Sequence, residues 1–132
     1  MVIRCLRFAV VYLMLGVGMG LAMGVSHRFE YAPVHAHDNL LGWVSMALFA
    51  LIYHVHPQAA TTCLARWHFV LHNVGVPVFM VGLFLLLSGE AWAETFVRIG
   101  GGVTFAGLIL FAINLMRSLA ATNRRAGVMS DG

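Results

Sequence analysis

The chain has 132 residues, of which 61% are hydrophobic and only 10% are charged, and its formal net charge is +3. Because a soluble domain carries about 25% charged residues, this composition excludes an ordinary water-soluble protein. It predicts a small all-α integral membrane protein surrounded by membrane lipid, and so small a net charge indicates no nucleic-acid partner.

Four apolar stretches approach or exceed the ~18 residues that a helix needs to cross a bilayer. Since a lipid-exposed span must satisfy its own backbone hydrogen bonds, we predict that each stretch is a helix. The predicted helices cover approximately residues 8–25, 37–53, 67–88 and 97–119. Short connections between them force consecutive helices to lie antiparallel as neighbours. Residues 1–132 are therefore predicted to form one four-helix up-down bundle.

The first predicted helix carries Gly16, Gly20 and Gly24 at a strict four-residue spacing. Such a glycine face allows another helix to approach closely, and the sequence leaves open whether that helix belongs to the same chain or to a second copy. Two arginines before this helix also suggest a cleaved signal peptide. The apolar run is longer than the usual 7–15 residues and lacks a convincing cleavage site, so we expect a retained helix.

Charge is distributed unequally between the two sides of the predicted bundle. Arg28 and Arg98 lie in or beside the first and third loops, together with most of the acidic residues. The other arginines fall at the N-terminus, in the second loop and in the C-terminal tail: Arg4, Arg7, Arg66, Arg117, Arg124 and Arg125. The positive-inside rule therefore predicts that both termini are cytoplasmic. Cys5 and Cys63 would then lie on the reducing side, where no disulfide is expected.

Two closely spaced histidines, His35 and His37, open the second predicted helix. Imidazole is an axial ligand for haem iron and a common ligand for copper and zinc. Two imidazoles at the head of a membrane helix are costly unless they hold something or lie in the interfacial layer. Residues two apart on a helix point about 200° apart, so the pair would serve two different groups, or one ligand and one hydrogen-bond partner. Asp38 and Asn39 follow directly and are expected to orient these rings.

A second histidine pair, His68 and His72, lies four residues apart on one face of the third predicted helix. Metal-binding histidines often share this spacing, so a cation site is one interpretation and simple core packing is the other. With the predicted helix ends, His72 lies on the order of 15–20 Å deeper than His37. A single haem or ion would then not be shared by those two residues. His54 and His56 are expected to cap the cytoplasmic interface.

The run from His35 and His37 through Leu41-Gly42-Trp43-Val44 to Pro57, followed by Trp67-His68-Phe69, resembles a known family. It is similar to the catalytic subunit I of haem–copper oxidases, above all that of C-type (cbb-type) cytochrome c oxidases, and to the nitric oxide reductase large subunit. In that family the first histidine of such a pair binds the high-spin haem and the second binds the low-spin haem. The resemblance implies His35 and His37 as ligands of haem b, in a multi-pass protein of the bacterial inner membrane.

The resemblance covers only part of that family's catalytic subunit, which has many more helices than the four predicted here. The copper ligands and the opposing ligand of the low-spin haem belong to other family helices. The resemblance therefore does not imply reduction of oxygen or nitric oxide by this chain alone.

Three functions remain open on the sequence. The favoured one is a haem b protein of respiratory electron transfer or diatomic gas binding, in which His37 and then His35 are axial ligands. The missing ligand would come from His27, a methionine, or His37 of a second copy. The alternative is a non-redox carrier of copper or haem, or an assembly factor, with His35, His37, His68 and His72 as metal ligands. The third is an accessory bundle that binds no cofactor. Expected partners are a second copy or respiratory oxidase components.

Overall fold

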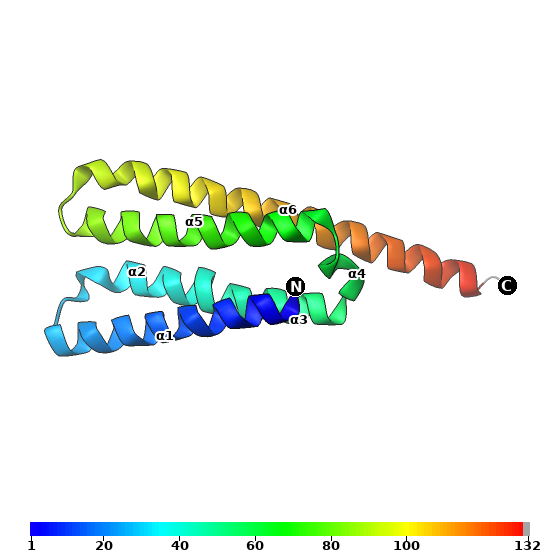
Figure 1. Ribbon diagram of the computed structural model, residues 1–132, viewed down its shortest axis with the longest axis horizontal. Helices are drawn as coiled ribbons and strands as arrows, with labels where there is room; N and C mark the ends of the chain where they lie inside the picture. The colour runs from blue at the N-terminus through cyan, green and yellow to red at the C-terminus, as the bar shows by residue number, and fades with distance from the viewer. Residues whose placement is uncertain (131–132) are drawn as a thin grey trace.

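The computed structural model describes residues 1–130, with side chains up to residue 124, and is helical almost throughout (Figure 1). The elements in chain order are α1 (Val2–Ser26), η1 (Phe29–Tyr31), α2 (Ala32–His37), η2 (Asp38–Val44), α3 (Ser45–Val55), α4 (Pro57–Ala60), α5 (Cys63–Leu87), η3 (Ala91–Ala93) and α6 (Glu94–Ser130). The segment Phe29–Val55, from η1 to α3, is one membrane-length unit that we call helix 2.

Four of these units are long and apolar enough to cross a membrane: α1, helix 2, α5 and the segment Ala91–Arg124. The surface of the bundle is apolar, since large residues such as Leu21, Leu40 and Val81 are exposed. The core is mainly apolar as well and also holds a few polar residues, among them Asp38 and His72. So extensive an apolar surface is suited to lipid. The all-helical prediction is confirmed over the described residues.

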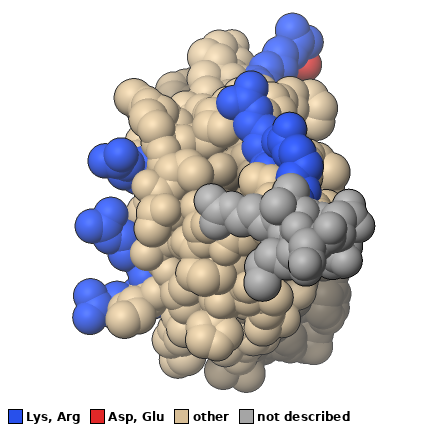
Figure 2. Space-filling view, turned by 90° about the vertical axis from the view of Figure 1, so that its right-hand side faces the viewer, with Lys and Arg blue, Asp and Glu red and all other residues tan. Residues whose placement is uncertain are grey.

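The four units alternate in direction and form two antiparallel hairpins, one of α1 with helix 2 and one of α5 with α6 (Figure 1). One end of the bundle holds residues 1–7, 54–66 and 114–124, and we call it the Arg-rich end. The opposite end holds the connections 26–31 and 88–93, and we call it the loop end. Figure 2 looks at the Arg-rich end and shows arginine side chains standing around its rim.

The helices extend beyond their predicted limits. At the Arg-rich end α1 begins at Val2, α5 begins at Cys63 and α6 continues to Ser130, while helix 2 begins at Phe29 at the loop end. Hydropathy locates only the apolar part of a span. The helical hydrogen bonds continue through polar and arginine-bearing turns, whose side chains reach out of the hydrocarbon layer.

The α5–α6 hairpin is held together by glycines at seven-residue spacing on both helices, Gly75 and Gly82 on α5 and Gly100 and Gly107 on α6. A Cβ atom added at Gly75 would lie 2.6 Å from the Thr104 backbone nitrogen. One added at Gly82 would lie 2.8 Å from the backbone nitrogen of Val97. The two backbones therefore touch between His72 and Gly82 of α5, as small residues allow in membrane helices.

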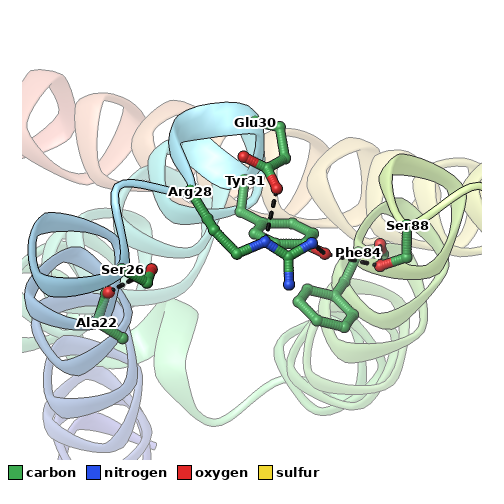
Figure 3. A network of polar contacts seen from close by, with 7 residues as sticks. All are labelled: Ala22, Ser26, Arg28, Glu30, Tyr31, Phe84 and Ser88. Carbon is green, nitrogen blue, oxygen red and sulfur yellow. Dashed lines mark hydrogen bonds and ion pairs between the residues drawn. The ribbon is translucent and has the colours of Figure 1, made fainter.

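At the loop end a polar network links the two hairpins (Figure 3). The Arg28 guanidinium donates to the Glu30 carboxylate at 2.7 Å and to the Tyr31 hydroxyl at 2.6 Å. Tyr31 also hydrogen-bonds Ser88 at 3.0 Å and stacks on Phe84, with ring centroids 4.6 Å apart. The hydrogen bond that Arg28 donates to Glu30 raises the pKa of Arg28, so the guanidinium stays charged. The network fixes the start of helix 2 against the end of α5.

Candidate functional site

His35 lies against the glycine face of α1. Its ring nitrogen Nδ1 donates to the Gly16 carbonyl at 2.8 Å, because a carbonyl oxygen can only accept. A Cβ atom at Gly20 would lie 2.9 Å from His35 Cε1, whereas Gly24 has open space around it. The partner of this glycine face is therefore helix 2 of the same chain, and the face is filled by His35 and its neighbours.

Asp38 and Asn39 complete this contact with α1. A Cβ atom at Gly16 would lie 2.8 Å from an Asp38 carboxylate oxygen and 2.6 Å from the Asn39 amide nitrogen. Asn39 donates to the His35 backbone carbonyl at 2.8 Å and lies 3.4 Å from the His35 ring. The buried Asp38 oxygen Oδ2 has no hydrogen-bond partner within the described residues. Asn39 thus positions His35, while Asp38 contributes an unpaired acceptor beside it.

The His37 side chain projects from a different side of helix 2 than His35 does, toward α5. Its ring packs edge-on against Phe79, with centroids 5.1 Å apart, and its Nδ1 donates to the Pro33 carbonyl at 2.7 Å. The side chain is half-buried. Three exposed apolar residues follow it at four-residue spacing: Leu40, Val44 and Leu48. The two histidines of the motif therefore face different surroundings, as the helical angle between them predicts.

The turn after His37 is π-helical, from Asp38 to Val44, which the sequence did not reveal. A π turn widens the helix and releases backbone carbonyls from the regular pattern. The Leu41 carbonyl accepts a hydrogen bond of 2.8 Å from His72 Nε2 on α5. Gly42 makes room for Tyr12 of α1, whose ring atom Cδ1 would lie 2.6 Å from a Cβ atom there. The π turn is where three helices meet.

His68 and His72 are completely buried, each with 0% of its surface exposed. His68 Nδ1 donates to the Gly107 carbonyl of α6 at 3.0 Å. The remaining ring nitrogens, His68 Nε2 and His72 Nδ1, have no hydrogen-bond partner within the described residues. Phe49 packs edge-on against both rings, at centroid distances of 4.5 and 5.2 Å. The shared face predicted from their spacing exists, and it points into the core.

The predicted difference in depth between His37 and His72 is wrong. His72 is hydrogen-bonded to Leu41, which is only four residues beyond His37, or about 6 Å along the helix. The prediction of 15–20 Å assumed that the second helix begins at residue 37 and the third at residue 67. Because the helices begin at Phe29 and Cys63, His37 lies deeper and His72 lies higher than the sequence suggested.

All four histidines donate one N–H to a backbone carbonyl, which leaves the other ring nitrogen with a lone pair. Metal-bound histidines have this arrangement, since the donated hydrogen bond fixes the tautomer and the ring orientation. In the part of the chain that the structure describes, no three His, Cys, Asp or Glu side chains gather as a metal site.

The apolar surface available to a porphyrin lies beside His37 and not on the covered part of the α1 glycine face. Gly16 and Gly20 of α1 are covered by His35, Asp38 and Asn39, and Phe49 packs against the buried histidines. These residues form no open wall. Leu40, Val44 and Leu48 form the exposed apolar stripe that follows His37 on helix 2.

A polar cluster at the Arg-rich end carried no signal in the sequence. Thr62 donates to the Asn114 side chain at 2.8 Å, and Asn114 donates to the Ala59 carbonyl at 2.9 Å. Gln58 donates to Thr122 at 3.2 Å. These residues are single polar side chains scattered over α4, α5 and α6, and only the fold brings them together.

No protein-family model matches the chain, and no solved structure matches it. Among curated proteins, the chain is 26% identical over 127 residues to the cbb3-type cytochrome c oxidase subunit CcoN1 of Stutzerimonas stutzeri, across 74% of this chain and 27% of that protein. It is 26% identical over 78 residues to cytochrome c oxidase subunit 1 of Rhodobacter capsulatus, across 53% of this chain and 15% of that protein.

A third relative is a cytochrome c oxidase subunit 1 homolog of Agrobacterium tumefaciens, 26% identical over 133 residues, across 78% of this chain and 25% of that protein. The chain is a distant relative of haem–copper oxidase subunit I. It spans about a quarter of the length of these relatives, or less. The resemblance stated from the histidine motif is thereby confirmed, and the chain is a related multi-pass membrane protein.

Proposed function

We propose that this protein binds haem b in the bacterial inner membrane and acts in respiratory electron transfer or in the binding of a diatomic gas. The observation that supports the proposal is the hydrogen bonding of the His37 ring. Its Nδ1–H is held by the Pro33 carbonyl, and no hydrogen bond to its Nε2 is found within the described residues. A half-buried imidazole in this tautomer is suited to be an axial ligand.

The surroundings of His37 fit a porphyrin better than those of His35. Leu40 and Val44 provide an exposed apolar surface beside His37, whereas the His35 ring is packed against Gly20. We therefore assign His37 as the principal ligand and His35 as the second, each to a different group. When bound, haem iron supplies reversible one-electron transfer or an axial position for a gas. Asn39 holds the backbone turn from which His35 projects.

In this proposal the axial ligand opposite His37 comes from outside the chain, across the exposed apolar stripe of Leu40, Val44 and Leu48. A second copy of the chain or a component of a respiratory oxidase would supply it and cover the apolar stripe. The relatives are oxidase subunits, which supports such a partner. The positive-inside rule supports a cytoplasmic position for the Arg-rich end, which carries Arg4, Arg7 and Arg66 among others.

The proposal is tested by the absorption spectrum of protein purified in mild detergent from cells supplied with haem precursor. We expect a Soret band that is lost in His37→Ala and retained in His54→Ala, since His54 is an exposed histidine at the Arg-rich end. A folded protein without this band, or equal spectra for the two variants, contradicts haem binding at His37.

A second candidate function, a carrier of copper or haem for oxidase assembly, is favoured by a separate observation. His68 Nε2 and His72 Nδ1 are buried nitrogens, one helical turn apart, that have no hydrogen-bond partner among the residues described. Buried polar atoms are nearly always paired, so two orphaned imidazole nitrogens are the donor type that copper accepts. Metal analysis of the purified protein decides between haem binding and the carrier function. Copper without porphyrin supports the carrier, provided that His68→Ala loses the copper and His54→Ala retains it.

A further inference from the structure

His68 and His72 each offer one ring nitrogen that has no hydrogen-bond partner within the described residues. Both rings are inside the bundle, with 0% of their surface exposed. The Gly107 carbonyl of α6 orients the His68 ring, and the Leu41 carbonyl of helix 2 orients the other ring. Because these carbonyls come from two different helices that pack on α5, the two nitrogens are held in place without an ion. Which ion they select depends on their separation, on further ligands and on the surrounding charge.

The separation of the two rings is compatible with a single ion between them. Their centroids are 5.7 Å apart, and their planes are inclined by 46°. An imidazole–metal bond is about 2 Å long, and a ring nitrogen lies about 1 Å from the centroid of its ring. An ion midway between two nitrogens that face each other would therefore place the centroids about 6 Å apart. The observed separation is close to this value.

The ligands available to an ion between these rings are few. Within the described residues, no third His, Cys, Asp or Glu side chain forms a metal-binding group with His68 and His72. Aromatic side chains pack against the rings instead: Phe49 contacts both, and the Phe111 centroid lies 5.1 Å from that of His68. Zn²⁺ normally takes four ligands, and Cu²⁺ prefers a square of nitrogen and oxygen ligands. Two nitrogens leave both ions under-coordinated, whereas Cu⁺ is stable with two ligands in a line.

The charge around the two rings also favours a monovalent ion. Among the described residues, Asp38 is the only acidic side chain that is buried, and it lies against Gly16 of α1. Its carboxylate is not grouped with the two histidines. The electrostatic cost of burying an ion grows with the square of its charge, so a divalent ion beside two neutral imidazoles costs about four times as much as a monovalent one.

From these observations we infer that His68 and His72 bind one Cu⁺ ion in a linear, two-coordinate site. Nε2 of His68 and Nδ1 of His72 are the ligands, and both already carry a lone pair, so binding releases no proton. The inference rests on the carrier function proposed above and names the form of copper that is carried. It is independent of haem binding at His37, whose ring packs against Phe79.

Binding is measured on the purified full chain in mild detergent under anaerobic conditions. Cu⁺ is supplied as its coloured complex with bathocuproine disulfonate, and loss of the colour reports transfer of the ion to the protein. We expect one Cu⁺ per chain to be held against the chelator, and an excess of Zn²⁺ to leave it in place. The X-ray absorption spectrum should show the strong pre-edge feature of linear Cu⁺ and two nitrogen neighbours at about 2 Å.

Two variants preserve the carbonyl contacts and remove one ligand each. In His68→Asn the side-chain amide can donate to the Gly107 carbonyl, as Nδ1 of the histidine does. In His72→Gln the amide can donate to the Leu41 carbonyl, as Nε2 does. We expect the affinity for Cu⁺ to fall in both by more than the roughly tenfold that the loss of an orienting partner costs, without loss of thermal stability. His54→Gln, at an exposed position, should bind as the unmodified chain does.

The outcomes separate this inference from the functions proposed above. Copper uptake that persists in His68→Asn, or that is lost equally in His54→Gln, overturns the inference. So does a folded chain that takes up no copper and holds only a water molecule between the two nitrogens. A four-coordinate copper or zinc ion that depends on His68 overturns the two-coordinate site but leaves a metal carrier in place. A linear Cu⁺ site that passes no copper to a copper-depleted oxidase supports the site and contradicts the carrier. Copper uptake in His37→Ala should equal that of the unmodified chain, whether or not haem is bound.

Discussion

His72 Nε2 lies 2.8 Å from the Leu41 carbonyl oxygen and donates to it, which joins the middle of α5 to the π turn of helix 2. This bond places His72 about one helical turn from His37 along the bundle. It also determines the state of the ring, because Nδ1 must then carry the lone pair. His72, which the sequence placed much deeper than His37, therefore lies near the depth of His37, and His68 lies one further turn toward the Arg-rich end.

The contribution of this bond can be measured with His72→Leu. Leucine fills much of the space but leaves the buried Leu41 carbonyl without its donor, so we expect a loss of about 1–3 kcal/mol in the free energy of unfolding. Equilibrium unfolding in mixed detergent micelles gives this value. His54→Leu, at an exposed position, should change stability by less than about 0.5 kcal/mol. Equal values for the two variants contradict the role assigned to the bond.

The glycine face of α1 offers a matched pair of substitutions. Gly20→Ala places a Cβ atom 2.9 Å from His35 Cε1, whereas Gly24→Ala meets nothing within 4 Å. We expect Gly20→Ala to lower the melting temperature, because overpacking a close contact costs about 1–3 kcal/mol, and to weaken haem retention by displacing the His35 ring. Gly24→Ala should leave both properties unchanged. If the two variants have the same melting temperature, α1 does not pack on helix 2 through this face.

The α5–α6 hairpin is tested in the same way with Gly100→Ala and Gly102→Ala. The first places a Cβ atom against the backbone of Phe79, which cannot move aside as a side chain can, and the second meets nothing within 4 Å. We therefore expect Gly100→Ala to be the most destabilising alanine substitution on α6, with a large fall in the yield of folded protein. Size-exclusion chromatography after mild detergent extraction measures this yield. A normal yield for Gly100→Ala is inconsistent with backbone contact between the two helices.

Much of the fold could be predicted from the sequence because lipid imposes a simple requirement: each apolar stretch must be a helix. Hydropathy therefore located all four membrane-length helices but not their ends, which continue through polar turns to residues such as Val2 and Cys63. The glycines of α1 predicted close packing, while the identity of the partner helix required the structure. The seven-residue glycine spacing of α5 and α6 is present in the sequence, but it acquires meaning only once the two helices are known to pair.

The site was less predictable than the fold. The opposite orientation of His35 and His37 follows from helical geometry, and the shared face of His68 and His72 follows from their spacing. The π turn at Asp38–Val44 has no signal in local residue preferences, since it depends on Tyr12 and His72 from neighbouring helices. The predicted difference in depth between His37 and His72 was wrong, because the errors in the predicted starts of their two helices add together. The polar cluster at the Arg-rich end depends on residues from three segments and lay beyond sequence reasoning.

The central claim, that His37 binds haem b, is tested most directly by measuring haem content. Protein purified from haem-supplied cells is converted to the pyridine haemochromogen, and the ratio of haem b to protein is compared for the unmodified chain, His37→Ala and His54→Ala. The account predicts haem b in the unmodified chain and in His54→Ala, and none in His37→Ala. A well-folded unmodified chain without haem b, or a His37→Ala variant that retains it in full, contradicts the account.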